Sequence, residues 1–163
     1  MSESKIIKVG MADLNTAKEP DVLTTLGLGS CVGIALYDPM TKVSGLAHIM
    51  LPDSTQIKNN ENKAKFADTA IDILLQEMVQ KGARKSRVVA KIAGGAHMFE
   101  FKNMDDMMCI GARNITAVIE KLGQINIPII AQDTGENYGR TIELYTVTGM
   151  LRVKTIGHGI REI

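Results

Sequence analysis

A cysteine and a histidine, Cys31 and His48, are the side chains in this sequence best suited to nucleophilic chemistry. Cys31 directly follows a glycine-rich turn, where backbone N–H groups around Gly29 and Ser30 could point at a developing oxyanion. A neighbouring imidazole is expected to lower the thiol pKa and to carry the thiol proton. Thr25, six residues before the cysteine, is the candidate to orient the imidazole. These residue types predict a cysteine–histidine–threonine site.

The residues between the cysteine and the histidine predict a β-hairpin that brings the two together. Residues 32–37 and 44–51 are apolar, and Asp38, Pro39 and Met40 supply turn chemistry between them. With the turn centred near Met40, the numbers of paired residues sum to roughly 80–82. The cysteine and histidine would then be diagonal neighbours, with roughly 7–8 Å between them. A register shifted by one residue would place them on opposite faces.

Each of these residues also has a purely structural interpretation. A cysteine at the start of an apolar strand commonly packs as a core residue, and a histidine in an apolar run is commonly buried and hydrogen-bonded. Threonine is a good strand former. The pair Gly94 and Gly95 follows a predicted strand, and it indicates either a turn or a close approach of the backbone to a neighbour or a substrate. Residue spacing alone leaves these alternatives open.

Composition limits the class of protein. A chain of 163 residues predicts one domain over residues 1–163. Nineteen basic and eighteen acidic residues leave a net charge of +1, which argues against nucleic acid or a membrane surface as partner. No signal peptide or span of ~20 apolar residues is visible, so a cytoplasmic protein with reduced thiols and no membrane insertion is expected. No metal-ligand or dinucleotide spacing occurs, which predicts no metal and no cofactor.

The rest of the chain alternates predicted strands with two amphipathic helices. The helix predicted over residues 63–81 has apolar residues at helical spacing. The second, over 112–122, has one apolar face, made of Ile115, Val118, Ile119 and Leu122. Further strands are predicted at 5–11, 22–26, 87–93, 127–132, 141–147 and 151–156. Residues 13–20 are expected to be a polar connection, 55–62 an exposed loop and 157–163 a loosely held tail. The run 98–109, rich in Phe and Met, suits either partner binding or a covered segment.

Six sequence blocks carry a resemblance to a known family. They are TLGLGSCVGIALYDP (25–39), GLAHIMLPDS (45–54), KAKFADTAI (63–71), AKIAGGAHMF (90–99), IGARN (110–114) and DTGENYGRTIE (133–143). With them the chain resembles the CheD family, the chemoreceptor glutamine deamidases of bacterial and archaeal chemotaxis. The resemblance implies that Cys31 is the nucleophile, that His48 is the base and that Thr25 completes the site. The chain departs from the family pattern at Glu136, where a second glycine usually stands.

The resemblance also implies an activity, a fold and partners. The expected enzyme is a protein-glutamine glutaminase that converts specific receptor glutamines to glutamate through a cysteine thioester, without a cofactor. The expected partners are the cytoplasmic domain of a chemoreceptor and the phosphatase CheC, which the family binds and stimulates. The expected fold is α+β, a layered sandwich with a mixed or antiparallel β core flanked by helices, similar to that of toxin glutamine deamidases. A mainly non-catalytic regulatory partner of CheC and receptors is the alternative.

Overall fold

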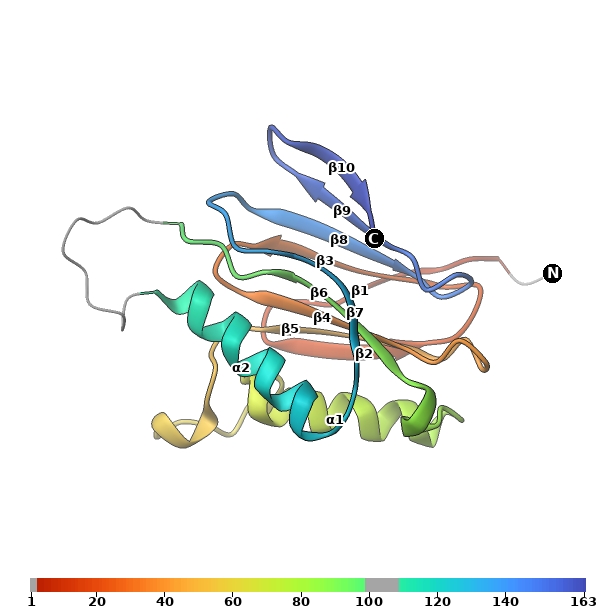
Figure 1. The fold of residues 1–163 in the computed structure, drawn as a ribbon. Coiled ribbons are helices and arrows are strands. Elements are labelled where there is room, and N and C mark those ends of the chain that lie inside the picture. Colours follow the sequence, from red (N-terminus) through yellow and green to blue (C-terminus); the bar gives the residue numbers. More distant parts are fainter. Residues whose placement is uncertain (1–2, 99–108) are drawn as a thin grey trace.

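The computed structural model describes residues 3–98 and 109–163, which form three layers (Figure 1). One layer, the outer sheet, has the strand order β1 (Ile6–Lys8), β3 (Val22–Leu28), β8 (Arg140–Tyr145), β9 (Leu151–Thr155) and β10 (Gly159–Glu162). The second layer, the central sheet, has the order β2 (Asp13–Ala17), β5 (Ser44–Ile49), β4 (Val32–Tyr37), β6 (Val89–Gly94) and β7 (Ile129–Thr134). The third layer holds α1 (Ala67–Gln80) and α2 (Ile110–Gln124). The predicted α+β layered sandwich is confirmed.

Both sheets are mixed. β1 pairs in parallel with β3, and β6 pairs in parallel with β7, while the other neighbouring strands run antiparallel. The parallel pair β6–β7 is connected through α2, as a parallel pair requires a crossover. Short 3-10 helices lie at Ser54–Gln56, Lys63–Lys65 and Lys85–Arg87. One domain over residues 1–163 stays a prediction.

The central sheet is buried on both faces, so its strands read as continuous apolar runs rather than alternating ones. One face packs on the helices through a cluster that includes Val32, Ile34 and Ile49. The other face packs on the outer sheet through a cluster that includes Cys31, Ala35 and Leu46. A residue near the end of β4 or β5 therefore faces either the helices or the space between the sheets.

The first predicted helix is confirmed in detail. Its buried residues are the five that share helical spacing in the sequence: Ala67, Ala70, Ile71, Leu74 and Met78. The helix itself begins at Ala67, after the 3-10 turn Lys63–Lys65. The side chains of Leu74 and Met78 lie against Gly45 of β5, where a Cβ atom would clash with both. This close contact seats α1 directly on the central sheet.

The second predicted helix is present, but its buried face is rotated from the predicted one. Of the predicted apolar face, Val118 and Leu122 are buried and Ile115 is partly buried against the core, whereas Ile119 is 41% exposed. The buried residues of α2 are Gly111, Asn114, Val118 and Leu122. Gly111 lies so close to the backbone of residues 95–96 that a Cβ atom would clash with it. This contact turns the polar Asn114 toward the sheet, which apolar periodicity does not predict.

Two segments are more ordered than predicted. The expected polar connection 13–20 contains β2, which pairs antiparallel with β5 at the edge of the central sheet. The expected loose tail contains β10, which pairs with β9, and Ile163 exchanges two backbone hydrogen bonds with Leu151. Both predictions are wrong because each segment has weak local strand propensity and is held by a neighbouring strand. For β2 that neighbour is β5, distant in sequence, and for β10 it is β9, the strand that precedes it.

Two further predictions have other outcomes. The exposed loop 55–62 is confirmed, because all of its residues are exposed, although its first two belong to the 3-10 turn Ser54–Gln56. The proposed partner-binding run at 98–109 lies for the most part outside the described residues, since Phe99, Phe101 and the methionines up to position 108 fall there. Among residues 3–98 and 109–163, no helix has the length and apolarity to cross a membrane.

Candidate active site

The β4–β5 hairpin has the predicted register. Gly33 pairs with His48, and Val32 with Ile49, so paired numbers sum to 81. Side chains alternate along a strand, so Cys31 is expected on the same face as Gly33 and therefore as His48. That face is the one toward the outer sheet, because a Cβ atom on Gly33 would meet Ile142 of β8. This register makes the cysteine and the histidine diagonal neighbours on one face, a relation in which residues typically lie roughly 7–8 Å apart.

The third residue of the predicted site comes from the other sheet. Thr25 of β3 lies across the gap between the sheets, with its Oγ1 2.7 Å from His48 Nδ1. The same hydroxyl donates to the backbone carbonyl of Val9 at 2.7 Å. A threonine hydroxyl has one proton, so with that proton on the carbonyl of Val9, the histidine Nδ1 must carry a hydrogen and donate it to Oγ1. This network assigns the Nδ1–H tautomer.

The tautomer leaves the second imidazole nitrogen, Nε2, with a free lone pair. His48 Nε2 is buried and has no hydrogen-bond partner within the described part of the chain. A buried polar atom without a partner costs stability and calls for an explanation. A lone pair held ready to accept the proton of the neighbouring thiol is such an explanation.

All three side chains are buried: Cys31 is 7% exposed, Thr25 1% and His48 0%. Burial raises the pKa of the Cys31 thiol, and a hydrogen bond from the residue's own backbone N–H to the sulfur only partly opposes this rise. Burial also lowers the pKa of His48. The expected lowering of the thiol pKa is therefore wrong for the protein without substrate, because desolvation disfavours both charged forms. The site holds a neutral thiol beside a neutral imidazole at neutral pH.

The turn that carries the cysteine is fixed through its carbonyl groups. Three successive carbonyls each accept a hydrogen bond: Gly29 from the N–H of Ala96 at 2.8 Å, Ser30 from the side chain of Asn114 at 3.0 Å, and Cys31 from the N–H of Gly95 at 2.8 Å. The N–H of Gly29, an expected oxyanion donor, is instead engaged by the carbonyl of Gly27 at 3.1 Å. Among the residues that the structure describes, no other residue accepts from the N–H of Ser30 or Cys31, and the Cys31 N–H lies against its own thiol. The turn therefore keeps two N–H donors next to the thiol that no other residue engages.

The two glycines predicted as a supporting loop lie against this turn. Gly94 ends β6 and has a φ of +106°, and a Cβ atom there would clash with the carbonyl oxygen of Cys31. Gly95 also has a positive φ, +68°. Of the two alternatives from the sequence, a turn and a close backbone approach, both apply at this position. A side chain at Gly94 would displace the cysteine turn.

The loop between β7 and β8, residues 135–139, supports the pair Gly94 and Gly95. The N–H of Gly135 donates to the carbonyl of Gly94 at 3.0 Å, and the carbonyl of Glu136 accepts from the N–H of His97 at 2.8 Å. The loop is anchored by a buried ion pair between Arg140 and Asp133, with 2.9 Å between Nε and Oδ1. Glu136 adopts a left-handed conformation with a φ of 59°. Glycine adopts this conformation without strain, so the glycine expected here from the resemblance would fit this backbone.

Sequence reasoning missed one residue at the site, Asn114. Its side chain is fully buried, and its Nδ2 donates to the carbonyls of Ser30 and Met50, each at 3.0 Å. The signal in the sequence is a polar residue at helical spacing with two residues of the buried face, Val118 and Leu122. A buried amide at such a position calls for partners, and these are the two backbone segments that flank the site.

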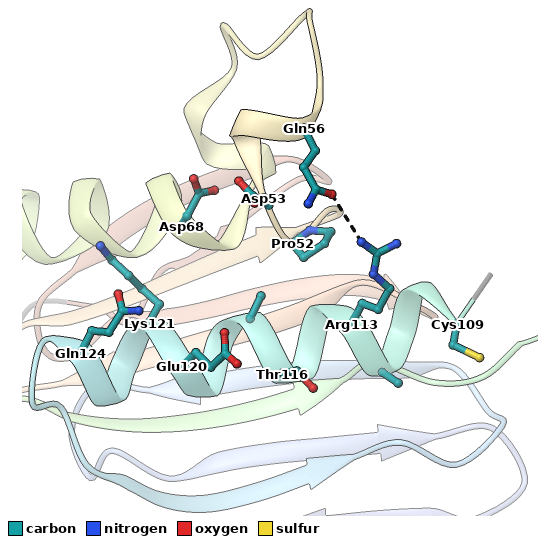
Figure 2. Close-up of a pocket in the computed structure, with 12 residues that line it drawn as sticks. Pro52, Asp53, Gln56, Asp68, Cys109, Arg113, Thr116, Glu120, Lys121 and Gln124 are labelled. Atoms are coloured by element: carbon teal, nitrogen blue, oxygen red, sulfur yellow. Dashed lines mark hydrogen bonds between the residues drawn. The ribbon is translucent and has the colours of Figure 1, made fainter. Parts of the chain in front are cut away.

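A pocket elsewhere on the surface has a different character. Its volume is ≈ 650 Å³, and it lies between α2 and the segment around Ser54–Gln56, as Figure 2 shows. Its lining includes Arg113 and Gln56, joined by a 3.4 Å hydrogen bond, and Cys109 at one end. No histidine lines it. Over residues 3–98 and 109–163, no group of three or more Cys, His, Asp or Glu side chains is placed to hold a metal ion.

A cysteine, a histidine and a threonine gathered between two mixed sheets, with helices on the far side, define a layered α+β protein with a buried thiol–imidazole site. The chain belongs to the CheD family, since the family model described as "CheD chemotactic sensory transduction" matches residues 50–155. This range begins after His48, so the three site residues are identified from the geometry above and from the resemblance of the surrounding blocks.

Relatives match over nearly the whole chain. A protein of Caldanaerobacter subterraneus subsp. tengcongensis is 59% identical over 161 residues, 99% of each chain. Those of Lachnoclostridium phytofermentans and Syntrophomonas wolfei are 59% and 56% identical, and each match covers 98% of this chain and 99% of the relative. All three bear the name "Probable chemoreceptor glutamine deamidase CheD". Among solved structures, the Bacillus licheniformis hypothetical protein YfiH aligns with a TM-score of 0.45 and 16% identity, over 75% of this chain and 50% of that one.

Proposed function

We propose that this protein is a chemoreceptor glutamine deamidase with Cys31 as its nucleophile. The observation that carries the proposal is the orientation of His48: Thr25 holds its Nδ1–H, and its unpartnered Nε2 remains as a base on the face that carries the thiol. Family membership and the names of the relatives support glutamine deamidation as the reaction. The substrate is the side-chain amide of specific glutamines in the cytoplasmic domain of a chemoreceptor.

The first half of the reaction forms a thioester. His48 Nε2 takes the thiol proton of Cys31 as the sulfur attacks the carboxamide carbon, and the carbonyl oxygen becomes an oxyanion. Because both groups are neutral before substrate binds, proton transfer accompanies attack rather than preceding it. The N–H groups of Ser30 and Cys31, which no other described residue engages, are the donors for that oxyanion. Collapse breaks the C–N bond, and the imidazolium gives its proton to the departing ammonia.

The second half of the reaction releases glutamate. Water attacks the thioester carbon and passes a proton to His48 Nε2, and the same N–H donors hold the new oxyanion. The carbon–sulfur bond then breaks, and the imidazolium returns its proton to the sulfur. One amide and one water become one carboxylic acid and one ammonia, and the Cys31 thiol is restored. Thr25 keeps the imidazole in the Nδ1–H tautomer through both halves.

The test is mass spectrometry of a receptor cytoplasmic fragment incubated with the protein. Deamidation adds about 1 Da at each converted glutamine, a change from amide to carboxylate that acyl-transfer chemistry leaves. Cys31→Ala is expected to abolish the gain, because loss of a nucleophile costs orders of magnitude in rate. Cys109→Ala, the matched control at the other cysteine, is expected to leave it unchanged. A fragment that the wild-type protein leaves unmodified, or one that Cys31→Ala still converts at the wild-type rate, would contradict the proposal.

We also propose CheC as a partner that docks over the mouth of the site, on the family resemblance alone. Receptor and CheC then compete for one surface. A pull-down of CheC with the protein is expected to lose CheC as receptor fragment is added in excess. A stable complex of all three proteins would contradict a shared surface.

A further inference from the structure

We infer that Asn114 is a positioning residue, which orients the Cys31 N–H toward the reacting carbonyl. The inference rests on the proposed function. Its basis is the 3.0 Å hydrogen bond from Asn114 Nδ2 to the carbonyl of Ser30. That carbonyl and the Cys31 N–H belong to the same peptide group. A trans peptide is planar, so its C=O and N–H point in opposite directions. The partner of the carbonyl therefore decides where the N–H points.

The layers of the fold give that direction. Asn114 belongs to α2, whose buried residues Val118 and Leu122 pack on the helix-side face of the central sheet. Cys31 belongs to the cluster on the opposite face, between the two sheets. With the Ser30 carbonyl held toward α2, the Cys31 N–H points away from the helix layer. It then faces the side of the sheet on which the thiol and His48 lie.

The same amide also joins the two segments that carry the nucleophile and the base. Its Nδ2 donates a second bond, at 3.0 Å, to the carbonyl of Met50, two residues after His48. Both protons of one planar amide are thus committed to the two open ends of the β4–β5 hairpin. The helix that supplies the amide is itself fixed in place, since Gly111 lies in direct contact with the backbone of Gly95 and Ala96.

The two polar ends of the Asn114 side chain are used unequally. Asn114 is fully buried, and its Oδ1 has no hydrogen-bond partner in the described part of the chain. An acceptor left in this state opposes folding and offsets part of the stability that the two donated bonds contribute, whereas an apolar side chain would leave the two carbonyls without their donor. The half of the side chain that forms bonds is the half that faces the active-site backbone, so the residue serves the geometry of the site.

The test compares Asn114→Ala with Val118→Ala, which shortens a buried side chain one turn along the same helix and leaves the amide in place. Removing one oxyanion donor costs roughly 10²–10³ in kcat, and misdirecting one is expected to cost at least about tenfold. The KM for a receptor fragment should stay within about twofold, because the amide makes no contact with substrate in the ground state. The rate of Cys31 alkylation by iodoacetamide should stay within about threefold, since alkylation forms no oxyanion.

Three outcomes would overturn the inference. The first is a kcat for Asn114→Ala equal to that of Val118→Ala. The second is a loss of kcat/KM that comes from a higher KM. The third is an alkylation rate that falls as much as kcat does, which would indicate general damage to the turn. If Asn114→Ala does not fold, Asn114→Ser replaces it, because serine has one donor and cannot bond both carbonyls. A wild-type kcat in that variant also overturns the inference.

A readout without substrate separates this inference from the proposed function. The backbone ¹⁵N resonance of Cys31 reports the hydrogen bond on the preceding carbonyl, and it is expected to shift in Asn114→Ala but not in Val118→Ala. If the two variants show this pattern but the wild-type protein deamidates no receptor fragment, the proposed function is refuted and the role of Asn114 in orienting the peptide stands. An active wild-type protein whose Cys31 resonance is unchanged in Asn114→Ala refutes the positioning role.

Discussion

Thr25→Val tests how the imidazole is held, because valine keeps the shape of threonine and removes its hydroxyl. The hydroxyl is the only described partner of His48 Nδ1, and it also serves the carbonyl of Val9. Two buried groups lose their partner, and each unpaired group costs about 1–3 kcal/mol of folding free energy. We therefore expect roughly 2–4 kcal/mol of destabilisation, the lower part of the summed range, because valine also removes the cost of burying the hydroxyl itself.

The effect on activity follows from the tautomer. Without Oγ1 nothing favours the proton on Nδ1, and an imidazole that carries it on Nε2 cannot accept the thiol proton. A preference of about 1.4–2.7 kcal/mol corresponds to a 10- to 100-fold loss of kcat. This is smaller than the ~10⁴-fold cost of losing the correct tautomer where a buried carboxylate orients the histidine, because threonine is neutral.

The control for Thr25→Val is the neighbouring residue. Thr24 is also buried, and its hydroxyl donates to the carbonyl of Ile142 at 2.8 Å without touching the histidine. Thr24→Val should therefore cost stability and leave kcat near wild type. The tautomer itself is measured by ¹⁵N NMR of the imidazole, which should show a protonated Nδ1 and a bare Nε2 in the wild-type protein. A proton on Nε2, or equal kcat for the two valine variants, would refute the reasoning.

Three other predictions concern the loop at Glu136, the ion pair between Asp38 and Arg87, and pH. Glu136→Gly should raise the free energy of unfolding by about 0.5–1 kcal/mol in denaturant titrations, because relief of left-handed strain exceeds the added freedom of the unfolded chain; a lower stability would contradict this. Burial raises the pKa of Asp38, but hydrogen bonds from Arg87 and from backbone N–H groups outweigh it and hold the pKa well below its usual range. The carboxylate thus adds stability above the unfolded pKa of about 4, which is lost as pH falls. Asp38→Asn should cost about 2–3 kcal/mol at pH 7, less than a fully buried pair, since Arg87 is partly solvated. An acid unfolding midpoint equal to that of the wild-type protein would contradict this. Because burial lowers the pKa of His48 and raises that of Cys31, kcat/KM should rise with pH through a midpoint below 6.5 and then stay level to about pH 9; a fall between pH 7 and 8 would count against neutral reactants.

The local parts of the fold and site were predictable from the sequence. A hairpin places residues by counting from its turn, so the pairing of Gly33 with His48 follows from Asp38, Pro39 and the apolar runs on either side. The buried apolar face of α1 follows from helical periodicity in the same way. The contact between Thr25 and His48 joins two sheets, and the family resemblance rather than spacing made it a firm expectation.

The parts that failed depend on packing between segments distant in sequence. The rotation of α2 is set where Gly111 meets residues 95–96, and apolar periodicity does not register a contact made by glycine. The pKa of the thiol was predicted to be lowered by its histidine neighbour, whereas burial between the two sheets raises it. β2 has weak strand propensity and forms because β5 offers it an edge.

The central claim is that Cys31 forms a covalent bond with a receptor glutamine. Its most direct test is intact-mass spectrometry of the protein mixed with excess receptor fragment and quenched in acid within the first turnover. The account predicts an adduct with the summed mass of the two chains less one ammonia, mapped to Cys31, present with Cys109→Ala and absent with Cys31→Ala. Deamidation that proceeds with no adduct at any time point and survives Cys31→Ala would contradict it.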